Sequence, residues 1–540
     1  MTKPTCLVSV VIALLLTSTL LPVSAHSLLD EGCNPKEHNA RKQKHVRRQV
    51  VSSGEGSSPG SSGGAAAAAY KCDPSVCLIE NNCRCASTTP PGNLDLSDVP
   101  QFIVLTADDA VQSYTVDALE TLIGGRTNGN GCKATLSYYT SLSYTNYSMI
   151  TELAVDRHWE FADHTVSHVG APAKDEIAGN LIALNALSGL TYKSVAGFRA
   201  PFLNYTMETL QHLHDLGFTY DSSMSSSVPV TSEATDAYWP YTLDFGAAND
   251  CGDGISGMCS GQPQLPGLWE FPMYSVYDSE GTAYLMDPWL EDEPDVVLKW
   301  MQNTFLDHYA RKTPFGMYSH PINIASGYPG LPDKTSTVAM LNEFLDWATL
   351  NSSLPNVWLV TNQQLLAWIR NPVKASELNT LDEFKCNTPN VTQPICSGIP
   401  HLEAGLLQHC ISDVAGDPLN NSPFYTCYGC PETTPSAANP NPAQKNNDGS
   451  VRFRIPADCD TPFWDPIAGK CLASGYTDTT RSIGANGANV APQGGTNVNG
   501  SSSSGDTYQS FNAATSPPKG YSMTFVCSVM LIILAAGHWL

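Results

Sequence analysis

The chain has 540 residues, of which 51 are acidic and 28 are basic, so its formal net charge at pH 7 is −23. This acidity excludes a protein that binds nucleic acid by neutralising phosphates, and it favours a neutral polymer or a small molecule as the partner. The length is sufficient for a full catalytic core with appendages.

The N-terminal residues have the features of a secretory signal. Lys3 precedes an apolar stretch that is too short to span a membrane, and small residues follow where cleavage is expected. We therefore predict a signal peptide over residues 1–25 and a propeptide over residues 26–48, which ends in a pair of arginines. A solvated basic linker is the alternative for residues 26–48. Residues 49–70, rich in Gly, Ser and Ala, are expected to form a flexible linker.

The C-terminal residues resemble the signal for a lipid anchor. Three small residues are followed by a polar spacer and by an apolar tail over residues 523–540, a pattern that is removed when a glycolipid is attached. We expect a cell-surface or cell-wall protein with a GPI anchor in the plasma membrane. A plain transmembrane anchor is the alternative, although no basic residue follows the tail. Sequons compatible with the secretory route begin at Asn146, Asn204, Asn351, Asn390, Asn420 and Asn499.

The cysteines indicate an oxidising compartment. Removal of Cys6 with the signal, Cys33 with the propeptide and Cys527 with the tail leaves 14 of the 17 cysteines, an even number that suits disulfides. Four of them lie in a Cys-rich segment over residues 71–94, where a disulfide knot is favoured over a zinc site. They are Cys72, Cys77, Cys83 and Cys85.

The central region, residues 95–372, has the pattern of an α/β domain. Short apolar runs, such as 102–106 and 357–361, alternate with amphipathic segments, such as 176–189 and 205–217, which predicts parallel strands connected by helices. A second Cys-rich appendage is predicted over residues 373–474. A disordered stalk that carries the anchor site is predicted over residues 475–522.

Two neighbouring acids, Asp108 and Asp109, directly follow the apolar run 102–106. Ligands enter α/β sheets at the carboxyl ends of the strands, so the pair lies where chemistry is expected. Adjacent carboxylates repel each other, and a positive group such as a bound cation must hold at least one of them ionised. An exposed, Asp-rich turn is the alternative for this dipeptide taken alone.

Further candidate residues follow along the chain. His164 and His168 are four residues apart, a spacing at which one zinc ion can bind both imidazoles, and two histidines with one carboxylate are a recurrent metal triad. Arg199 in "GFRAPF" offers a fixed cation, and His320 follows an apolar run at another predicted strand end. Taken alone, a histidine or an arginine more often makes a structural hydrogen bond, so each of these patterns has low specificity by itself.

Taken in order, four motifs resemble those of the polysaccharide deacetylases, carbohydrate esterase family 4, and in particular secreted eukaryotic chitin deacetylases. The motifs are T-A-D-D-A (106–110), H-T-V-S-H (164–168), R-A-P-F (199–202) and S-H-P (319–321). The resemblance covers residues 95–372. It implies a distorted parallel (β/α) barrel with fewer than eight strands, flanked by small disulfide-rich segments.

The resemblance implies a metal site and a base. Asp109, His164 and His168 would bind one divalent ion, Zn²⁺ in the first place and Co²⁺ as the alternative. Asp108 would be the general base, held ionised by Arg199.

It also implies the remaining catalytic groups. His320 would be the general acid, and the backbone N–H of Phe202 would donate to the oxyanion. The family's further motif, an Asp followed shortly by a Trp that braces the acid histidine, has no clean match here. Trp269 and Glu270 of "LWEFP" lie in the right interval and are candidates for a substrate-binding role.

Two residues depart from the family pattern beside the proposed base. Ala107 stands where the family usually has a large residue, and Ala110 stands where it has glycine. The turn around the base is therefore expected to differ from that of the family.

The activity implied is metal-dependent hydrolysis of N-acetyl groups on chitin or a related N-acetylglucosamine polymer, which gives chitosan and acetate. The alternative is a catalytically weak or inactive surface protein that binds glycans on the same scaffold. Retention of base, acid and metal ligands together favours the enzyme. The sequence carries no prediction of the oligomeric state.

Overall fold

The computed structural model describes residues 70–251, 258–327, 330–386 and 428–444, together with short strands at 408–412, 422–426, 464–465 and 470–471. The chain divides into two units, Met1–Ser502 and Ser503–Leu540, and the whole of the second unit lies outside the described residues. The predicted signal peptide, propeptide, stalk and anchor also lie outside them.

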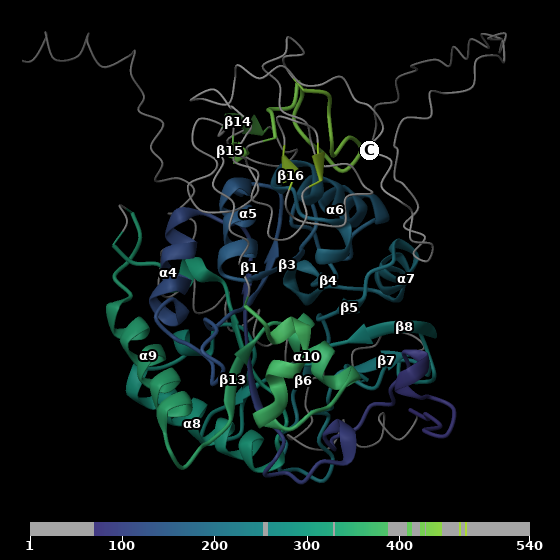
Figure 1. The fold of residues 1–540 in the computed structure, drawn as a ribbon, viewed down its shortest axis with the longest axis vertical. Coiled ribbons are helices and arrows are strands. Elements are labelled where there is room, and N and C mark those ends of the chain that lie inside the picture. The colour runs from purple at the N-terminus through teal and green to yellow at the C-terminus, as the bar shows by residue number, and fades with distance from the viewer. Residues whose placement is uncertain are drawn as a thin grey trace, which may run out of the picture. The chain divides into compact units, whose positions relative to one another are not determined.

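A nine-stranded, mostly parallel sheet occupies the centre of the described part (Figure 1). Its strands are β1 (Gln101–Asp108), β2 (Ser137–Thr140), β3 (Glu160–Asp163), β4 (Gly197–Phe198), β5 (Tyr220–Asp221), β7 (Tyr241–Leu243), β8 (Leu265–Glu270), β12 (Phe315–Ser319) and β13 (Val357–Val360). The spatial order is β12-β1-β2-β3-β4-β5-β8-β7, and β13 also pairs with β1. Every pairing is parallel except that of β7 with β8. The predicted α/β class is confirmed.

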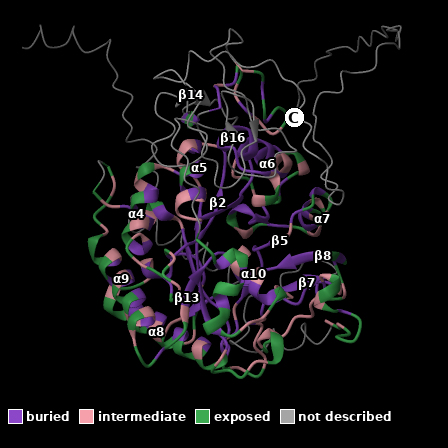
Figure 2. Ribbon diagram, viewed as in Figure 1, coloured by how far each residue is buried: buried purple, intermediate pink, exposed green. Residues whose placement is uncertain are grey.

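Helices connect the strands and cover the sheet. They are α4 (Ser113–Ile123), α5 (Tyr147–Asp156), α6 (Lys174–Ser188), α7 (Met207–Leu216), α8 (Pro294–Arg311), α9 (Thr335–Leu350) and α10 (Asn362–Arg370). In α7, Leu210, Leu213 and Leu216 recur every three residues and are buried, which explains why this segment is helical and which face it buries. Figure 2 shows the strands buried and the outer faces of α8 and α9 exposed.

Shorter elements complete the described part. The short strands are β6 (Ser225–Ser226), β9 (Met273–Tyr274), β10 (Val276–Tyr277), β11 (Ala283–Tyr284), β14 (Gln408–Ser412), β15 (Ser422–Thr426), β16 (Trp464–Asp465) and β17 (Lys470–Cys471). The 3₁₀ turns are η1 (Ile79–Asn81), η2 (Pro91–Asn93), η3 (Tyr192–Ser194), η4 (Pro201–Leu203), η5 (Pro288–Leu290), η6 (Pro321–Asn323), η7 (Ala375–Thr380) and η8 (Asp382–Phe384).

The central strand β1 brings the ends of several strands together. All eight of its residues are buried. It pairs with β12 along most of its length, with β13 near its start and with β2 near its end. In this register Ala107 lies opposite Ser319 and Asp108 lies opposite Tyr139. The residues that follow β1 and β12 therefore emerge side by side at the carboxyl edge of the sheet.

The number of strands differs from the prediction of fewer than eight. The sheet has nine because β7 adds an antiparallel strand and because β1 pairs with both β2 and β13 on different parts of its length. Strands β4 and β5 have only two residues each. Such short strands carry no alternation of apolar and polar residues from which a sequence could predict them.

The core also extends beyond the predicted limit at residue 372. Leu378, Leu381 and Phe384 are buried in one cluster with Trp358 and Trp368, which come from β13 and α10. A disulfide between Cys132 and Cys386 then fastens the end of this segment to the loop before β2. The segment to residue 386 is thus packed on the sheet domain.

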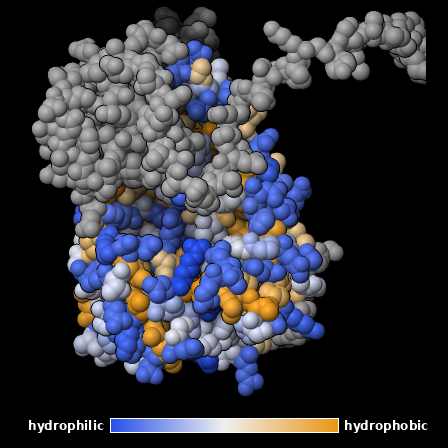
Figure 3. All heavy atoms as spheres, turned by 45° about the vertical axis from the view of Figure 1, so that its right-hand side comes forward, coloured by the Kyte–Doolittle hydropathy of each residue, from blue (hydrophilic) through white to orange (hydrophobic). Residues whose placement is uncertain are grey.

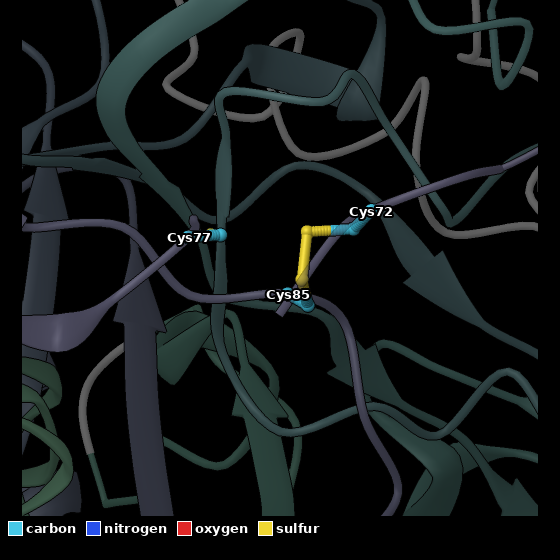
Figure 4. A group of neighbouring side chains, drawn as sticks. All are labelled: Cys72, Cys77 and Cys85. Atoms are coloured by element: carbon cyan, nitrogen blue, oxygen red, sulfur yellow. A yellow bond between two sulfur atoms is a disulfide. The ribbon is translucent and has the colours of Figure 1, made fainter. Parts of the chain in front are cut away.

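The N-terminal cysteines form the predicted disulfides. Cys72 pairs with Cys85 and Cys77 pairs with Cys83, and Figure 4 shows the first of these bonds beside Cys77. Because zinc binds thiolates, these bonds remove the ligands that a zinc site would need. The knot packs on the sheet domain, since the Asn82 side chain accepts a hydrogen bond from the Trp269 indole at 3.0 Å.

The surface drawn in Figure 3 has hydrophobic residues interspersed among hydrophilic ones. Among the described residues, no helix is long and apolar enough to cross a membrane.

We predict that Leu378→Ala destabilises the fold by about 2–5 kcal/mol, because the side chain is fully buried and its loss leaves a cavity in the core. Chemical denaturation measures the free energy of unfolding. The exposed neighbour Ser376→Ala is the matched control and should change it by less than about 0.5 kcal/mol. Equal, small effects of both substitutions would show that this segment is not part of the core.

Candidate active site

The two neighbouring acids at the end of β1 face different partners. Asp108 is the last residue of the strand, and its side chain is 4 % exposed. Asp109 adopts a left-handed backbone, with φ of 85°, and its side chain is 41 % exposed. Its N–H donates to the Tyr139 carbonyl at 2.9 Å, which holds this turn against β2. The turn therefore places the Asp108 carboxylate in the interior and the Asp109 carboxylate in a more exposed position, so the two can have different roles.

A buried ion pair joins Asp108 to Arg199. The guanidinium Nη1 lies 2.7 Å from Asp108 Oδ1, and the Arg199 side chain is completely buried. Arg199 also donates to the Thr106 hydroxyl and to the carbonyl and hydroxyl of Ser222, and its guanidinium lies 4.0 Å from the Tyr139 ring centroid. Burial alone would lower the pKa of Arg199, but the charge of Asp108, the hydrogen bond with it and the nearby hydroxyls of Tyr139 and Tyr318 together outweigh burial and raise that pKa. The two charges compensate each other inside the domain.

His164 and His168 lie on the loop that follows β3, which we call the histidine loop (residues 164–171). Their Nε2 atoms lie 3.8 Å and 3.0 Å from the same oxygen, Oδ1 of Asp109. One ligand atom from each of the three residues lies within 4.8 Å of the other two. The spacing of four residues is achieved by a loop with left-handed residues rather than by a helix. The structure thus brings the predicted triad together.

The buried imidazole of His164 is oriented by the backbone. Its Nδ1 lies 2.8 Å from the Arg199 carbonyl oxygen. Since a carbonyl can only accept, Nδ1 carries the hydrogen and Nε2 keeps a lone pair that faces Asp109. Burial lowers the pKa of His164 to about 4, so the ring is neutral at pH 7. A neutral imidazole with a free Nε2 is the form that binds a metal ion.

The third ligand candidate, Asp109, is ionised. Burial would raise its pKa, but the hydrogen bond with His168 and the electrostatic interactions with His320, His168 and His164 together outweigh burial and hold the pKa well below its usual range. Two imidazole nitrogens and one carboxylate oxygen fit a divalent ion such as Zn²⁺ or Co²⁺ and leave positions for other ligands.

His320 follows β12 and is braced by an acid that the sequence analysis missed, Asp287. His320 Nδ1 lies 2.7 Å from Asp287 Oδ2, and the His320 backbone N–H donates to Asp287 Oδ1 at 3.0 Å. Burial lowers the pKa of His320, but the charge of Asp287 and this hydrogen bond, with Asp109 and Asp108, raise it to about 10. His320 is therefore protonated at neutral pH and can donate a proton from Nε2.

A sequence signal for Asp287 was present. Asp287 and Trp289 flank Pro288, so an acid is followed shortly by a tryptophan, but the pair lies 33 residues before its histidine and outside any predicted strand. The left-handed backbone of Asp287, with φ of 48°, turns its carboxylate towards His320 and Asn323, which donates to it at 2.8 Å.

The prediction of a substrate-binding role for Trp269 and Glu270 is wrong. Both are 0 % exposed within β8, so neither can contact a ligand from solvent. Trp269 belongs to the hydrophobic core. Glu270 lies opposite Asp221 in the sheet, and burial raises the pKa of both carboxyls.

Phe202 lies at the rim of the site. Its side chain is 52 % exposed, and its ring centroid lies 4.6 Å from that of His168. It has a left-handed backbone, with φ of 60°, in the turn η4. The role of its backbone N–H stays a prediction.

The structure also shows the surroundings of Ala107 and Ala110, the two residues that differ from the family pattern. Ala107 is fully buried in β1, so its small side chain is part of the core. The carbonyl of Ala110 accepts hydrogen bonds from the hydroxyls of Tyr138 and Thr115 at 2.7 Å and 3.2 Å. These bonds hold the turn after the paired acids.

A hollow of about 860 Å³ lies near the opposite end of β1. Its lining includes Asn356 and Val357, which pair with Gln101 at the start of that strand. It contains none of the candidate residues described above. The candidate residues therefore lie outside this hollow, at the other end of β1.

Comparison with known proteins is consistent with this geometry. A family model described as "Polysaccharide deacetylase" matches residues 97–220. Chitin deacetylase 8 of Bombyx mori is 27 % identical over 390 residues, covering 69 % of this chain and 93 % of that protein. Chitin deacetylase 1 of Bombyx mori is 27 % identical over 394 residues, covering 67 % of each protein.

Solved structures give lower similarity. A family 4 carbohydrate esterase from Streptomyces lividans has a TM-score of 0.24 and 12 % identity, covering 48 % of this chain and 92 % of that one. The chitin deacetylase of Colletotrichum lindemuthianum has a TM-score of 0.20 and 13 % identity, covering 45 % of this chain and 93 % of that one.

We predict that Asp287→Asn lowers the pKa of His320 in the metal-free protein from about 10 towards its ordinary 6.5, because the variant loses the charge that favours the imidazolium. At pH 8 the wild-type ring is then protonated and the variant ring is neutral. NMR titration of the His320 ring protons measures this pKa.

The exposed acid Asp333→Asn is the control and should leave the His320 pKa unchanged. The pKa of His320 is higher in the folded protein than in the unfolded chain. The His320–Asp287 pair therefore contributes fully to the stability of the fold below pH 6.5, and this contribution disappears as the pH rises through about 10. An unchanged His320 pKa in Asp287→Asn would contradict this assignment.

Proposed function

We propose that this chain, which contains a polysaccharide deacetylase domain of carbohydrate esterase family 4, hydrolyses the N-acetyl groups of chitin or a related N-acetylglucosamine polymer in a metal-dependent reaction. This proposal rests on one observation: the side chains of Asp109, His164 and His168 lie close together, beside the buried Asp108–Arg199 pair. Water and the N-acetyl group would give acetate and a free amine, so the polymer stays intact and gains positive charge.

In this proposal Asp109, His164 and His168 hold one divalent ion, Zn²⁺ rather than Co²⁺. The orientation of His164 by the Arg199 carbonyl supports the assignment, because metal-binding imidazoles are typically held by a hydrogen bond from their other nitrogen. When bound, the ion supplies Lewis acidity, which makes water nucleophilic near neutral pH and stabilises negative charge on oxygen.

Asp108 is the proposed general base. Arg199 contacts Oδ1 of this carboxylate, and we assign Oδ2 the role of taking a proton from the attacking water. Arg199 keeps this carboxylate in one orientation inside the domain. The backbone N–H of Phe202 is the proposed donor to the oxyanion that forms on the acetyl oxygen.

His320 is the proposed general acid. Its raised pKa, about 10, keeps Nε2 protonated at neutral pH, and Asp287 fixes the ring through Nδ1. Transfer of the Nε2 proton to the departing nitrogen lets the C–N bond break without formation of an amide anion. Asp287 is therefore a positioning residue for the acid.

We further propose that the protein acts outside the cell. The disulfides of the described residues and the similarity to insect chitin deacetylases support this location. Attachment to the plasma membrane through a lipid anchor is part of the proposal and rests on residues 512–540 of the sequence alone.

The alternative, a surface protein that binds glycans without hydrolysing them, predicts no product. Acetate release from N-acetylglucosamine oligomers, with and without a chelator, separates the two functions. The enzyme should release acetate, lose this activity with the chelator and regain it when zinc is added. Binding of the oligomers without acetate release at any zinc concentration would favour the alternative.

We predict that Asp108→Asn retains zinc but lowers kcat by about 10²–10⁴-fold, because the base is lost while the three proposed metal ligands remain. His164→Ala should lose both zinc and activity, since it removes a ligand. Zinc content by elemental analysis and acetate release are measured on the same samples. Substantial turnover by Asp108→Asn would remove this residue from the role of base.

A further inference from the structure

The histidine loop has an unfavourable backbone. Thr165, His168 and Ala171 have φ values of 68°, 54° and 46°, in the left-handed region. This region is disfavoured for residues other than glycine, and most of all for a β-branched residue such as Thr165. Such a conformation persists only where the surrounding structure holds it, so the contacts of this loop matter for the metal site.

Helix α6 holds the loop from one side. The Val166 N–H donates to the Glu176 carbonyl at 3.1 Å. The Glu176 carboxylate accepts the N–H of Ser167 at 3.0 Å and its hydroxyl at 2.8 Å. The residues between the two histidines are therefore fastened to the first turn of α6.

A segment near the C-terminus packs on the same helix. We call residues 422–426 and 428–444 the C-terminal segment. Figure 1 shows β15 next to α5, which it contacts. The Thr426 hydroxyl donates to the Leu187 carbonyl at 2.5 Å, and the Phe424 ring packs edge-on against Tyr147 of α5 at 5.7 Å. Tyr428 is completely buried. These contacts dock the segment firmly on the sheet domain.

The C-terminal segment and the histidine loop meet at Gly179 of α6. A Cβ atom at Gly179 would lie 2.9 Å from Cγ2 of Val166 and 3.1 Å from the Cα of Ala437. Val166 is 1 % exposed, so it is enclosed at this point. Glycine is required here because both neighbours pack directly on the helix backbone.

We propose that the C-terminal segment and Glu176 hold the histidine loop in the geometry that lets His164 and His168 share one ion. The segment packs on α6 at Ala437, and α6 supports the loop at Val166 and Ser167. This inference rests on the proposed metal site, and it gives the second Cys-rich region a role as a positioning element for that site.

The test measures zinc affinity in the full chain by competition with a chromogenic chelator. Gly179→Ala places a methyl group between Val166 and Ala437, and Thr426→Val removes the hydrogen bond to Leu187 with little change in shape. Glu176→Gln weakens the hydrogen bonds to Ser167. We expect the dissociation constant for zinc to rise about 10-fold or more for Gly179→Ala and Glu176→Gln, and to rise less for Thr426→Val. With zinc at saturation, kcat should stay near that of the wild type.

The matched control is Gly125→Ala, because a Cβ at Gly125 would meet nothing within 4 Å. It should leave zinc affinity unchanged. A lower melting temperature with an unchanged dissociation constant in all three test variants would show that the segment only stabilises the fold, and would overturn the inference. If the wild type binds no zinc, the proposed function fails and the inference fails with it.

Discussion

The buried pair of Asp108 and Arg199 organises the whole site. A carboxylate and a guanidinium lie 2.7 Å apart with almost no exposure, so each compensates a charge that would otherwise be costly to bury. Arg199 also acts through its backbone, because its carbonyl accepts the hydrogen of His164 Nδ1. Loss of its side chain would leave an uncompensated buried carboxylate, which typically costs about 3–5 kcal/mol. One residue thus connects the proposed base with the proposed metal ligands.

The sheet explains why residues distant in sequence meet here. Parallel strands end at one edge, and the register of β1 with β12 places His320 beside the paired acids. The left-handed turn at Asp109 then separates the two carboxylates, one towards Arg199 and the other towards the histidines. These positions give the two histidines opposite protonation states at neutral pH. Burial keeps His164 neutral, while nearby acids keep His320 protonated.

Much of this arrangement could be predicted from the sequence, because strand ends and ordered motifs are local patterns. The apolar run before Asp108 and that before His320 both mark strands of the sheet. Asp287 was missed because its contact with His320 depends on a turn rather than on a periodic element. The positions of Trp269 and Glu270 in the chain suggest a substrate-binding role, and only the packing of β8 shows that both side chains are enclosed. Burial of this kind results from tertiary contacts, which sequence spacing does not encode.

The proposed reaction depends on one divalent ion bound by this chain. X-ray absorption spectroscopy of the zinc-loaded protein at the zinc edge tests it most directly. We expect one zinc per chain with two imidazole nitrogens at about 2.0–2.1 Å and oxygen ligands at about 2.0–2.2 Å. A spectrum dominated by sulfur at about 2.3 Å, or one without imidazole scattering, would contradict the site at Asp109, His164 and His168.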